Sequence, residues 1–305
     1  MSVELEAVAD EVCANCGKAG VDDVKLKKCA CNLVKYCSTN CQKDHRPQHK
    51  KACKKRMAEI RDDELFTQPD GSSYGECPIC CLPLSLDKAK SSMNSCCCKL
   101  ICNGCVYANA MREMEQGMGM KCAFCREPVP KSDAEGNQKA MIRVKANDPA
   151  ALCQMGVNCT NEGDHEGAFN YFTKAAGLGA VDAHFSLSFS YRNGEGVEID
   201  IKKAVNHLET AAIAGHPDAR YNLGCYEGNA GRHARAMRHF IIAANLGCDK
   251  ALEAVKKGFV KGFVSKDDYA SALRGHQAAV DATKSAQREL ASVIDHSNQE
   301  LMNSW

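Results

Sequence analysis

The distribution of cysteine constrains the fold of this chain more than any other feature of its sequence. Of the 21 cysteines in 305 residues, 17 lie between Cys13 and Cys125. Most of them come in pairs with one to three residues between, close enough for two thiolates to reach one metal ion. The first residues, MSVELEAVADE, are acidic and lack the apolar stretch of a secretory signal. We therefore expect an intracellular protein, cytoplasmic or nuclear, whose cysteines bind zinc instead of forming disulfides.

The net charge of the protein changes once bound zinc is counted. The formal charge is +1 with every cysteine neutral, but zinc binds the thiolate form. Fifteen ligand thiolates and four Zn²⁺ ions bring the net charge to about −6. A mildly acidic protein is not expected to take nucleic acid as its default partner. No apolar run approaches the roughly 18 residues that span a bilayer, so we expect no membrane association.

Four ligand pairs near the N-terminus supply eight donors, enough for two tetrahedral sites. The donors are Cys13, Cys16, Cys29, Cys31, Cys37, Cys41, His49 and Cys53. The three-residue gaps suit one face of a helical turn, so we expect Cys37/Cys41 and His49/Cys53 on short helices. His45 lies one turn from His49 and competes as a ligand. Because eight donors are already present, we interpret His45 as a neighbouring histidine.

This segment resembles the MYND-type zinc finger. The resemblance lies in Tyr36-Cys37-Ser38, Cys41-Gln42 and His49-Lys50-x2-Cys53, behind the two upstream pairs. It implies interleaved sites, with one zinc bound by Cys13, Cys16, Cys37 and Cys41 and the other by Cys29, Cys31, His49 and Cys53. It also implies a peptide ligand, although the tryptophan that the family often carries after the Cys-Gln pair is Arg46 here.

A second module follows, again with four cysteine clusters. They are Cys77-Pro78-Ile79-Cys80, Cys96-Cys97-Cys98, Cys102-x2-Cys105 and Cys122-x2-Cys125. The module resembles a RING-type finger of all-cysteine form. The resemblance implies that Cys77, Cys80, Cys102 and Cys105 bind one zinc. The ligands of another would come from Cys96-Cys97-Cys98 and Cys122-x2-Cys125. Cys122 and Cys125 are then ligands of that second ion.

The second of these clusters offers three cysteines for two ligand positions. Because the side chains of adjacent cysteines diverge, we predict Cys96 and Cys98, whose one-residue gap fits the RING pattern. The alternative uses Cys97, with Lys99 at the usual histidine position. That alternative is less favourable because an ammonium group cannot bind a metal.

The RING resemblance implies recruitment of a ubiquitin-conjugating enzyme. Ile79 stands where the family has an apolar contact residue, and Arg126 stands where ligases often carry a basic residue that steadies the ubiquitin thioester. Against a ligase, the family's proline after the seventh ligand is Ala123. All four sites can be closed by protein ligands, whereas catalytic zinc keeps a position open for water. We therefore predict no catalytic residues.

From Asp148 onward the sequence is alanine-rich and repetitive. The motif Ala-Ala-x2-Gly recurs at intervals of 36 and 32 residues, in Ala175–Gly179, Ala211–Gly215 and Ala243–Gly247. Periods of this length are typical of solenoids built from helix pairs. The alanines permit close helix packing, and each glycine ends a helix where φ is positive. The region resembles Sel1-like repeats, best over Ala183–Gly215, and we count three.

Larger side chains of this region are expected in its core. The predicted core residues are Phe185, Leu187, Tyr191, Leu208, Tyr221, Leu223 and Phe240. The histidines of the repeats show no metal-ligand spacing. Beyond the repeats, Ser265-x2-Asp268 resembles a capping box and predicts one long helix from Asp267 to about Ile294, followed by a frayed tail.

These patterns predict small zinc-stabilised domains plus an all-α region: two cross-braced zinc fingers followed by an α-solenoid of helix pairs. The expected boundaries are 1–61 for the MYND-type finger, 62–73 for a linker, 74–130 for the RING-type finger, 131–147 for a second linker, 148–264 for the repeats and 265–305 for the C-terminal helix and tail. We expect four zinc ions, two per finger.

Two functions are compatible with this organisation. The first is a protein–protein interaction adaptor, in which the zinc fingers bind peptide ligands and the repeats bind a client protein. The alternative is a RING-type E3 ubiquitin ligase whose repeat array recruits the substrate. The sequence favours the adaptor narrowly and leaves enzymatic activity open.

Overall fold

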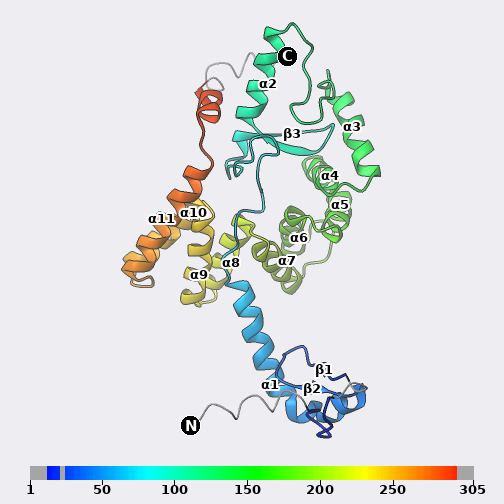
Figure 1. Ribbon diagram of the computed structural model, residues 1–305, viewed down its shortest axis with the longest axis vertical. Helices are drawn as coiled ribbons and strands as arrows, with labels where there is room; N and C mark the ends of the chain where they lie inside the picture. The colour runs from blue at the N-terminus through cyan, green and yellow to red at the C-terminus, as the bar shows by residue number, and fades with distance from the viewer. Residues whose placement is uncertain (1–11, 21–24, 294–305) are drawn as a thin grey trace. The chain divides into compact units, whose positions relative to one another are not determined.

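The computed structural model describes residues 12–20 and 25–293 and divides the chain into two compact units, Met1–Thr67 and Gln68–Trp305 (Figure 1). The acidic N-terminal segment and the predicted frayed tail lie outside the described residues. Among the helices that are described, none is both long enough and apolar enough to cross a membrane.

The first unit contains a short hairpin and one long helix. Strands β1 (Lys27–Lys28) and β2 (Lys35–Tyr36) pair in antiparallel orientation, and α1 spans Thr39–Leu65. The side chain of Ser38 caps the helix by accepting a hydrogen bond from the Cys41 N–H at 3.2 Å. This cap places the end of the hairpin next to the first turn of α1.

Helix α1 replaces the two short helices that were expected around the last two ligand pairs. It has 27 residues and includes Cys41, His49 and Cys53. It also continues to Leu65, into the segment where a linker was expected. Of its residues only His49 and Leu65 are buried, so no apolar stripe holds this helix against a core.

The second unit begins with the second cysteine module, residues 74–130. Its regular elements are η1 (Lys88–Lys90), β3 (Ser91–Asn94), β4 (Lys99–Cys102) and α2 (Asn103–Glu115). The two strands form an antiparallel hairpin in which Ser91 lies opposite Cys102. The buried core of the module is mostly cysteine, comprising Cys77, Leu84, Cys97, Ile101, Cys102, Cys105 and Cys122.

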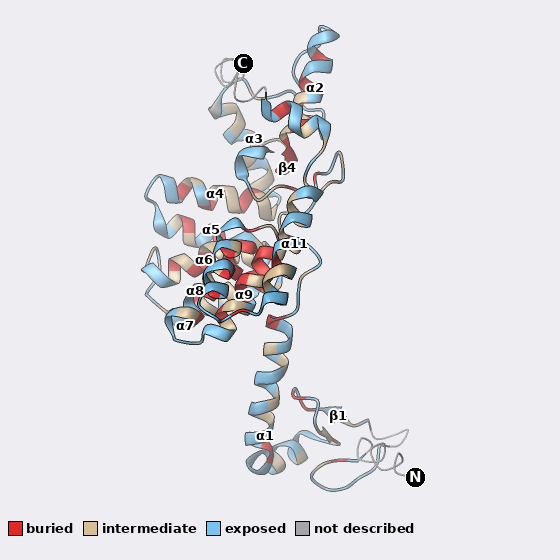
Figure 2. Cartoon of the chain, turned by 90° about the vertical axis from the view of Figure 1, so that its left-hand side faces the viewer, coloured by how far each residue is buried: buried red, intermediate tan, exposed pale blue. Residues whose placement is uncertain are grey.

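Helices make up the rest of the second unit. They are α3 (Asp133–Lys145), α4 (Pro149–Asn161), α5 (His165–Gly177), α6 (Val181–Asn193), α7 (Ile201–Ile213), α8 (Pro217–Asn229), α9 (His233–Asn245), α10 (Asp249–Val260) and α11 (Lys266–Ala282). Helices α4/α5, α6/α7 and α8/α9 pack as pairs, and each pair packs on the next. Buried residues lie between the helices while their outer faces are exposed (Figure 2). This is the predicted solenoid of helix pairs.

Small residues form much of the repeat core, as the Ala-Ala-x2-Gly motif predicts. Ala175, Ala211 and Ala243 are each fully buried. The glycines that end these motifs adopt φ of +86°, +84° and +92° at Gly179, Gly215 and Gly247. Of the larger residues predicted in the core, Leu187, Leu223 and Phe240 are buried, whereas Phe185, Tyr191, Leu208 and Tyr221 are half-buried.

Two further glycines let an aromatic ring pack directly on a helix backbone. A Cβ on Gly156 would lie 2.5 Å from the Phe172 ring, and a Cβ on Gly224 would lie 2.5 Å from the Phe240 ring. The intervals of 32 and 36 residues place Ser188 at the corresponding position of the middle repeat. In that repeat Leu208 stands where the other two repeats have phenylalanine. Ser188, which is larger than glycine, is therefore matched by Leu208, which is smaller than phenylalanine.

The expected helix from Asp267 to Ile294 is wrong in its length. Ser265 does cap α11, accepting a hydrogen bond from the Asp268 N–H at 3.0 Å, but the helix ends at Ala282. A separate helical segment follows over residues 286–293. The Ser285 hydroxyl caps this second segment by accepting a hydrogen bond from the Arg288 N–H at 3.3 Å.

The glycine–phenylalanine contact gives a test of the packing. Gly224→Ala should destabilise the second unit by about 1–3 kcal/mol, because the new methyl group overlaps a buried ring. Thermal unfolding measures the effect. Gly228→Ala is the matched control on the same helix, since its Cβ would meet only Ala236 at 3.7 Å. It should leave the melting temperature unchanged or raise it.

A double substitution makes this test specific. Adding Phe240→Leu to Gly224→Ala imitates the middle repeat, so the combined loss should be smaller than the sum of the two single losses. Additive losses would contradict a direct contact between these positions.

Candidate metal centres

Three Cys-x2-Cys pairs form the same tight turn, which we term a knuckle: Cys13–Cys16, Cys77–Cys80 and Cys122–Cys125. In each, the N–H of the first cysteine donates to the carbonyl five residues later, at 2.7–2.9 Å. The residue after each knuckle has positive φ, +69° in Gly17, +56° in Cys81 and +66° in Arg126. This position turns the chain away from the two sulfurs, so Cys81 is an exposed thiol outside the metal clusters.

Two clusters of ligand atoms form in the first unit. One comprises Cys13, Cys16, Cys37 and Cys41, and the other comprises Cys29, Cys31, His49 and Cys53, with the ligand atoms of each within 4.8 Å of one another. These are the interleaved sets that the MYND resemblance implies. Long stretches of chain separate the members of each set, and the hairpin and the first turns of α1 bring them together.

The second cysteine module contains two more clusters. One comprises Cys77, Cys80, Cys102 and Cys105, and the other comprises Cys96, Cys97, Cys122 and Cys125. We term these two sets the third and the fourth cluster of the chain. The third cluster joins the Cys77–Cys80 knuckle to the junction of β4 and α2. The fourth joins a knuckle to the turn between β3 and β4. The two sets therefore alternate along the sequence, as the cross-brace expectation requires.

The distances within the clusters fit tetrahedral zinc. Four sulfurs at about 2.3 Å from one zinc ion lie about 3.8 Å from each other. The Sγ–Sγ distances are 3.6 Å for Cys16–Cys37, 3.8 Å for Cys80–Cys102 and 3.8 Å for Cys97–Cys122. Cysteine sulfur and histidine nitrogen are the donors that zinc prefers. All four clusters are therefore compatible with Zn²⁺.

Backbone hydrogen bonds in the knuckles favour thiolates. Burial raises the pKa of Cys13 and of Cys77, but backbone N–H groups, first those of Cys16 and Cys80 respectively, outweigh it and lower each pKa to about 6. The pKa of Cys37 instead rises to about 12, chiefly through its side-chain contact with Cys16. Four crowded thiols thus resist full ionisation by themselves, and a divalent cation supplies the charge that lets all four bind as thiolates.

His45 lies beside the second cluster and outside it. Its ring stacks on that of His49, with centroids 5.7 Å apart and planes at 10°, and its Nδ1 lies 3.0 Å from the Tyr36 hydroxyl. His49 itself places Nε2 3.1 Å from the Cys31 sulfur. His45 therefore orients its neighbour, which agrees with its interpretation as a neighbouring histidine.

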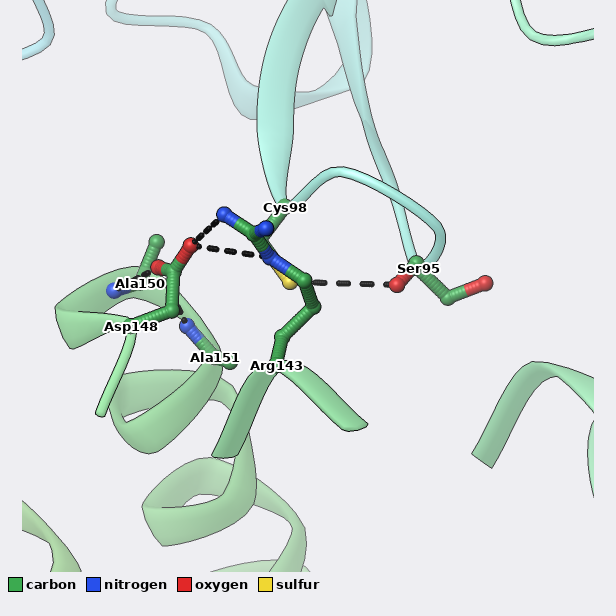
Figure 3. A network of polar contacts seen from close by, with 6 residues as sticks. All are labelled: Ser95, Cys98, Arg143, Asp148, Ala150 and Ala151. Carbon is green, nitrogen blue, oxygen red and sulfur yellow. Dashed lines mark hydrogen bonds and ion pairs between the residues drawn. The ribbon is translucent and has the colours of Figure 1, made fainter. Parts of the chain in front are cut away.

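The structure places Cys97, and not the predicted Cys98, in the fourth cluster. Cys98 has φ of +51°, which turns its side chain away from Cys96 and toward the helices that follow. Its sulfur lies 3.8 Å from the Ser95 carbonyl oxygen (Figure 3). The argument that adjacent cysteines diverge is wrong for Cys96 and Cys97, which both join the cluster, and it is Cys98, at positive φ, whose side chain leaves it.

Cys98 instead faces a polar network that begins the repeat region. Arg143, on α3, lies next to Cys98 and forms an ion pair with Asp148 (Figure 3). Asp148 in turn caps α4 by accepting hydrogen bonds from the N–H groups of Ala150 and Ala151, at 2.9 and 3.3 Å. The second cysteine module therefore contacts the first helices of the array at a buried thiol.

The two predicted partner-contact residues differ in their surroundings. Ile79 lies in a knuckle with 41% of its surface exposed. The side chain of Arg126 is also 41% exposed but is tied to α2, with Nη2 2.7 Å from the carboxylate of the fully buried Glu113 and Nη1 2.5 Å from Asn109 Oδ1. The ion pair crosses from the last knuckle to α2. The sequence alone could not identify it, because Glu113 looks like one of several charges on an amphipathic helix.

Two histidines of the repeats lie closer together than their sequence positions suggested. His184 on α6 and His207 on α7 place their Nδ1 atoms 2.9 Å apart. Tyr191 stacks on His207, with centroids 5.5 Å apart. Burial lowers the pKa of both histidines. Among the described residues no third donor completes a metal cluster with them.

The choice between Cys97 and Cys98 can be tested by matched substitutions. Cys97→Ser should reduce the zinc content of the purified chain by one ion, because serine supplies no thiolate. Cys98→Ser should leave the content unchanged, since this side chain faces Arg143. Native mass spectrometry measures both. Loss of zinc from the Cys98 variant alone would show that the fourth cluster is assigned wrongly.

Comparisons with known proteins find similar sequences and structures for parts of this chain. An uncharacterized protein of Neisseria meningitidis serogroup B is 34% identical over 88 residues, which are 27% of this chain and 18% of that protein. The chain thus spans about a fifth of the length of this curated relative. The crystal structure of a Sel1 repeat protein from Oxalobacter formigenes is 21% identical with a TM-score of 0.43, covering 58% of this chain and 74% of the other.

A second solved structure is similar over a shorter part of this chain. It is a protective antigen of uropathogenic Escherichia coli with an SLR fold, 27% identical with a TM-score of 0.40, covering 48% of this chain and 33% of the other. Family profiles identify segments directly. Residues 13–53 match the MYND finger, and residues 149–179, 181–216 and 217–248 each match the Sel1 repeat. The chain therefore carries a MYND finger, then a second cysteine-rich module, then three Sel1 repeats.

Proposed function

We propose that this protein is a zinc-dependent protein-interaction adaptor of the cytosol or nucleus, in which each module holds a different partner. The observation that carries the proposal is the composition of the four clusters. Each offers four cysteine or histidine donors, which closes a tetrahedral site, and within residues 12–20 and 25–293 no carboxylate joins them. Sites of this kind stabilise a fold, whereas a catalytic zinc keeps a position for water.

Zinc would supply the core that the first unit otherwise lacks. Its cluster of buried residues consists of Cys13, Cys29, Cys31 and Tyr36, three of which are proposed ligands. With so little buried apolar surface, coordination energy replaces hydrophobic burial as the main stabilising term. The finger would then present a rigid surface to a peptide, with Arg46 where the family often has tryptophan.

The repeat array would bind a larger client. Its helices are held by alanine, glycine and phenylalanine contacts that leave other faces exposed. Ile199 and Ile201 are exposed on either side of the start of α7, a position where apolar side chains gain from a partner. Arrays of stacked helix pairs commonly bind proteins along such surfaces.

A RING-type ubiquitin ligase is the second candidate, and two observations favour it. The ligand sets of the second module alternate along the sequence, as in a cross-brace. Ile79 and Phe124 lie in the two knuckles of the second module, and each has about two-fifths of its surface exposed. Both side chains are therefore accessible to a conjugating enzyme. One observation favours the adaptor instead. Arg126 is engaged by Glu113 and Asn109, so steadying a ubiquitin thioester would require it to leave a buried carboxylate.

An autoubiquitination assay distinguishes the two candidates. Zinc-loaded protein is incubated with a panel of conjugating enzymes, and wild type is compared with Ile79→Ala and Cys77→Ser. The adaptor predicts no ubiquitin transfer by any of them. Met93→Ala is the matched control, because Met93 is also 41% exposed and lies on β3 of the same module. Transfer that is lost in the Ile79 and Cys77 variants and kept in the Met93 variant would establish the ligase.

A further inference from the structure

The helical segment at residues 286–293 packs against the third cluster, although more than 180 residues separate them in sequence. The guanidinium of Arg288 makes the contact. Its Nη2 lies 3.2 Å from the Cys80 sulfur and donates to the Leu82 carbonyl at 3.0 Å. Its Nη1 donates to the Pro83 carbonyl at 2.6 Å. One side chain thus reaches a proposed zinc ligand and both carbonyls of the turn that follows it.

The same guanidinium is fixed from its own side of the contact. Nη1 also donates to the Thr283 carbonyl at 2.8 Å, at the end of α11. Ser285 caps the segment through the Arg288 N–H. The planar, five-donor guanidinium can serve several acceptors at once, which a lysine ammonium on a flexible stem does less well. Arg288 is therefore held in one position by the break in the C-terminal helix.

Close backbone packing accompanies the hydrogen bonds. A Cβ on Gly104 would lie 3.0 Å from the Arg288 N, Cα and Cγ atoms. The Gln287 amide donates to the Gly104 carbonyl at 2.9 Å. Gly104 lies in the first turn of α2, between the ligands Cys102 and Cys105, so the segment covers the cluster from a second side. A side chain here would have to displace the backbone of the segment by a few tenths of an ångström.

The charge of the cluster explains why a cation is favourable at this place. A zinc ion with four thiolates carries a net charge of −2, and Cys77, Cys102 and Cys105 are each no more than 5% exposed. Water therefore solvates little of that charge. A guanidinium that donates to one of the sulfurs offsets part of the charge and fixes the direction of that ligand.

We propose that Arg288 is a positioning residue of the third metal site, and that residues 286–293 are a functional part of the second cysteine module. This inference rests on the proposed zinc binding. It links the site to the repeat array as well, because α11, which precedes the segment, packs on α9 and α10.

Zinc release from the full chain tests the proposal. Wild type, Arg288→Ala and Arg288→Lys are loaded with zinc, and transfer of the metal to a chromogenic chelator is followed in time. Arg288→Ala should release one of its four ions about ten times faster than wild type, the usual scale for a lost ligand partner. Arg288→Lys should show a smaller acceleration. Arg274→Ala, an exposed arginine on α11, should leave every phase unchanged.

Thiol alkylation locates the effect. Iodoacetamide should modify Cys80 faster in Arg288→Ala than in wild type, while Cys16, an exposed ligand of the first cluster, should react at an unchanged rate. Gly104→Ala is a second variant that keeps the arginine and all sixteen ligands. It should accelerate release of the same ion by displacing the segment, and it decides the matter if Arg288→Ala fails to fold.

Three results are distinguishable. Faster release of one ion together with faster alkylation of Cys80 supports the inference. Four ions released at wild-type rates from both Arg288→Ala and Gly104→Ala overturn it and leave the proposed function intact. A wild-type chain that binds no zinc overturns both.

Discussion

Coordination of a metal by sulfur is the interaction on which the two cysteine modules depend. In both cysteine modules the buried core is made largely of the proposed ligands themselves, with few apolar side chains to assist them. The sheets are correspondingly small, with strands of two residues in one module and of four residues in the other. Without a cation, each cluster would bring together four groups that repel one another once ionised. Bound zinc would therefore determine both the fold and the charge of these two modules.

The repeats have a different source of stability. Fully buried alanines bring the helices close together, and at Gly156 and Gly224 a phenylalanine ring lies against bare backbone. Van der Waals contact and the hydrophobic effect suffice there, and no metal is needed. The second cysteine module and the helical region that includes the repeats contact each other at two places within the second unit. Cys98 faces Arg143 at the start of the array, and Arg288 reaches Cys80 from its end.

Much of this could be predicted from the sequence, because ligand spacing and repeat period are local or periodic signals. The MYND finger, the Sel1 repeats and the solenoid were all predicted in this way and are confirmed by the family profiles and the helix pairing. The zinc-compatible clusters follow from the same spacing. One missed element carried a readable signal. Helix α3 occupies a predicted linker, yet Ser132 and Glu135 have the spacing of a capping box, and they accept hydrogen bonds from the N–H groups of Glu135 and Lys131 respectively.

Other features depended on contacts that no local pattern reveals. The choice of Cys97 over Cys98 follows from a single positive φ and from Arg143, which lies 45 residues later. The break after α11 interrupts an apolar pattern that continues through Leu290, and it is followed by a serine cap joined to an arginine directed at another module. The pairing of Arg126 with Glu113 is a third such feature, because only the fold places α2 beside the last knuckle.

X-ray absorption at the zinc K edge reports the atoms bound to the metal in the folded chain and so tests whether cysteine sulfur closes all four sites. The four clusters together contain fifteen cysteines and one histidine. We predict four zinc ions per chain and a first shell of almost pure sulfur at about 2.3 Å, with roughly one nitrogen for every fifteen sulfurs. A shell with a substantial share of oxygen, or fewer than four ions in fully folded protein, would contradict this prediction.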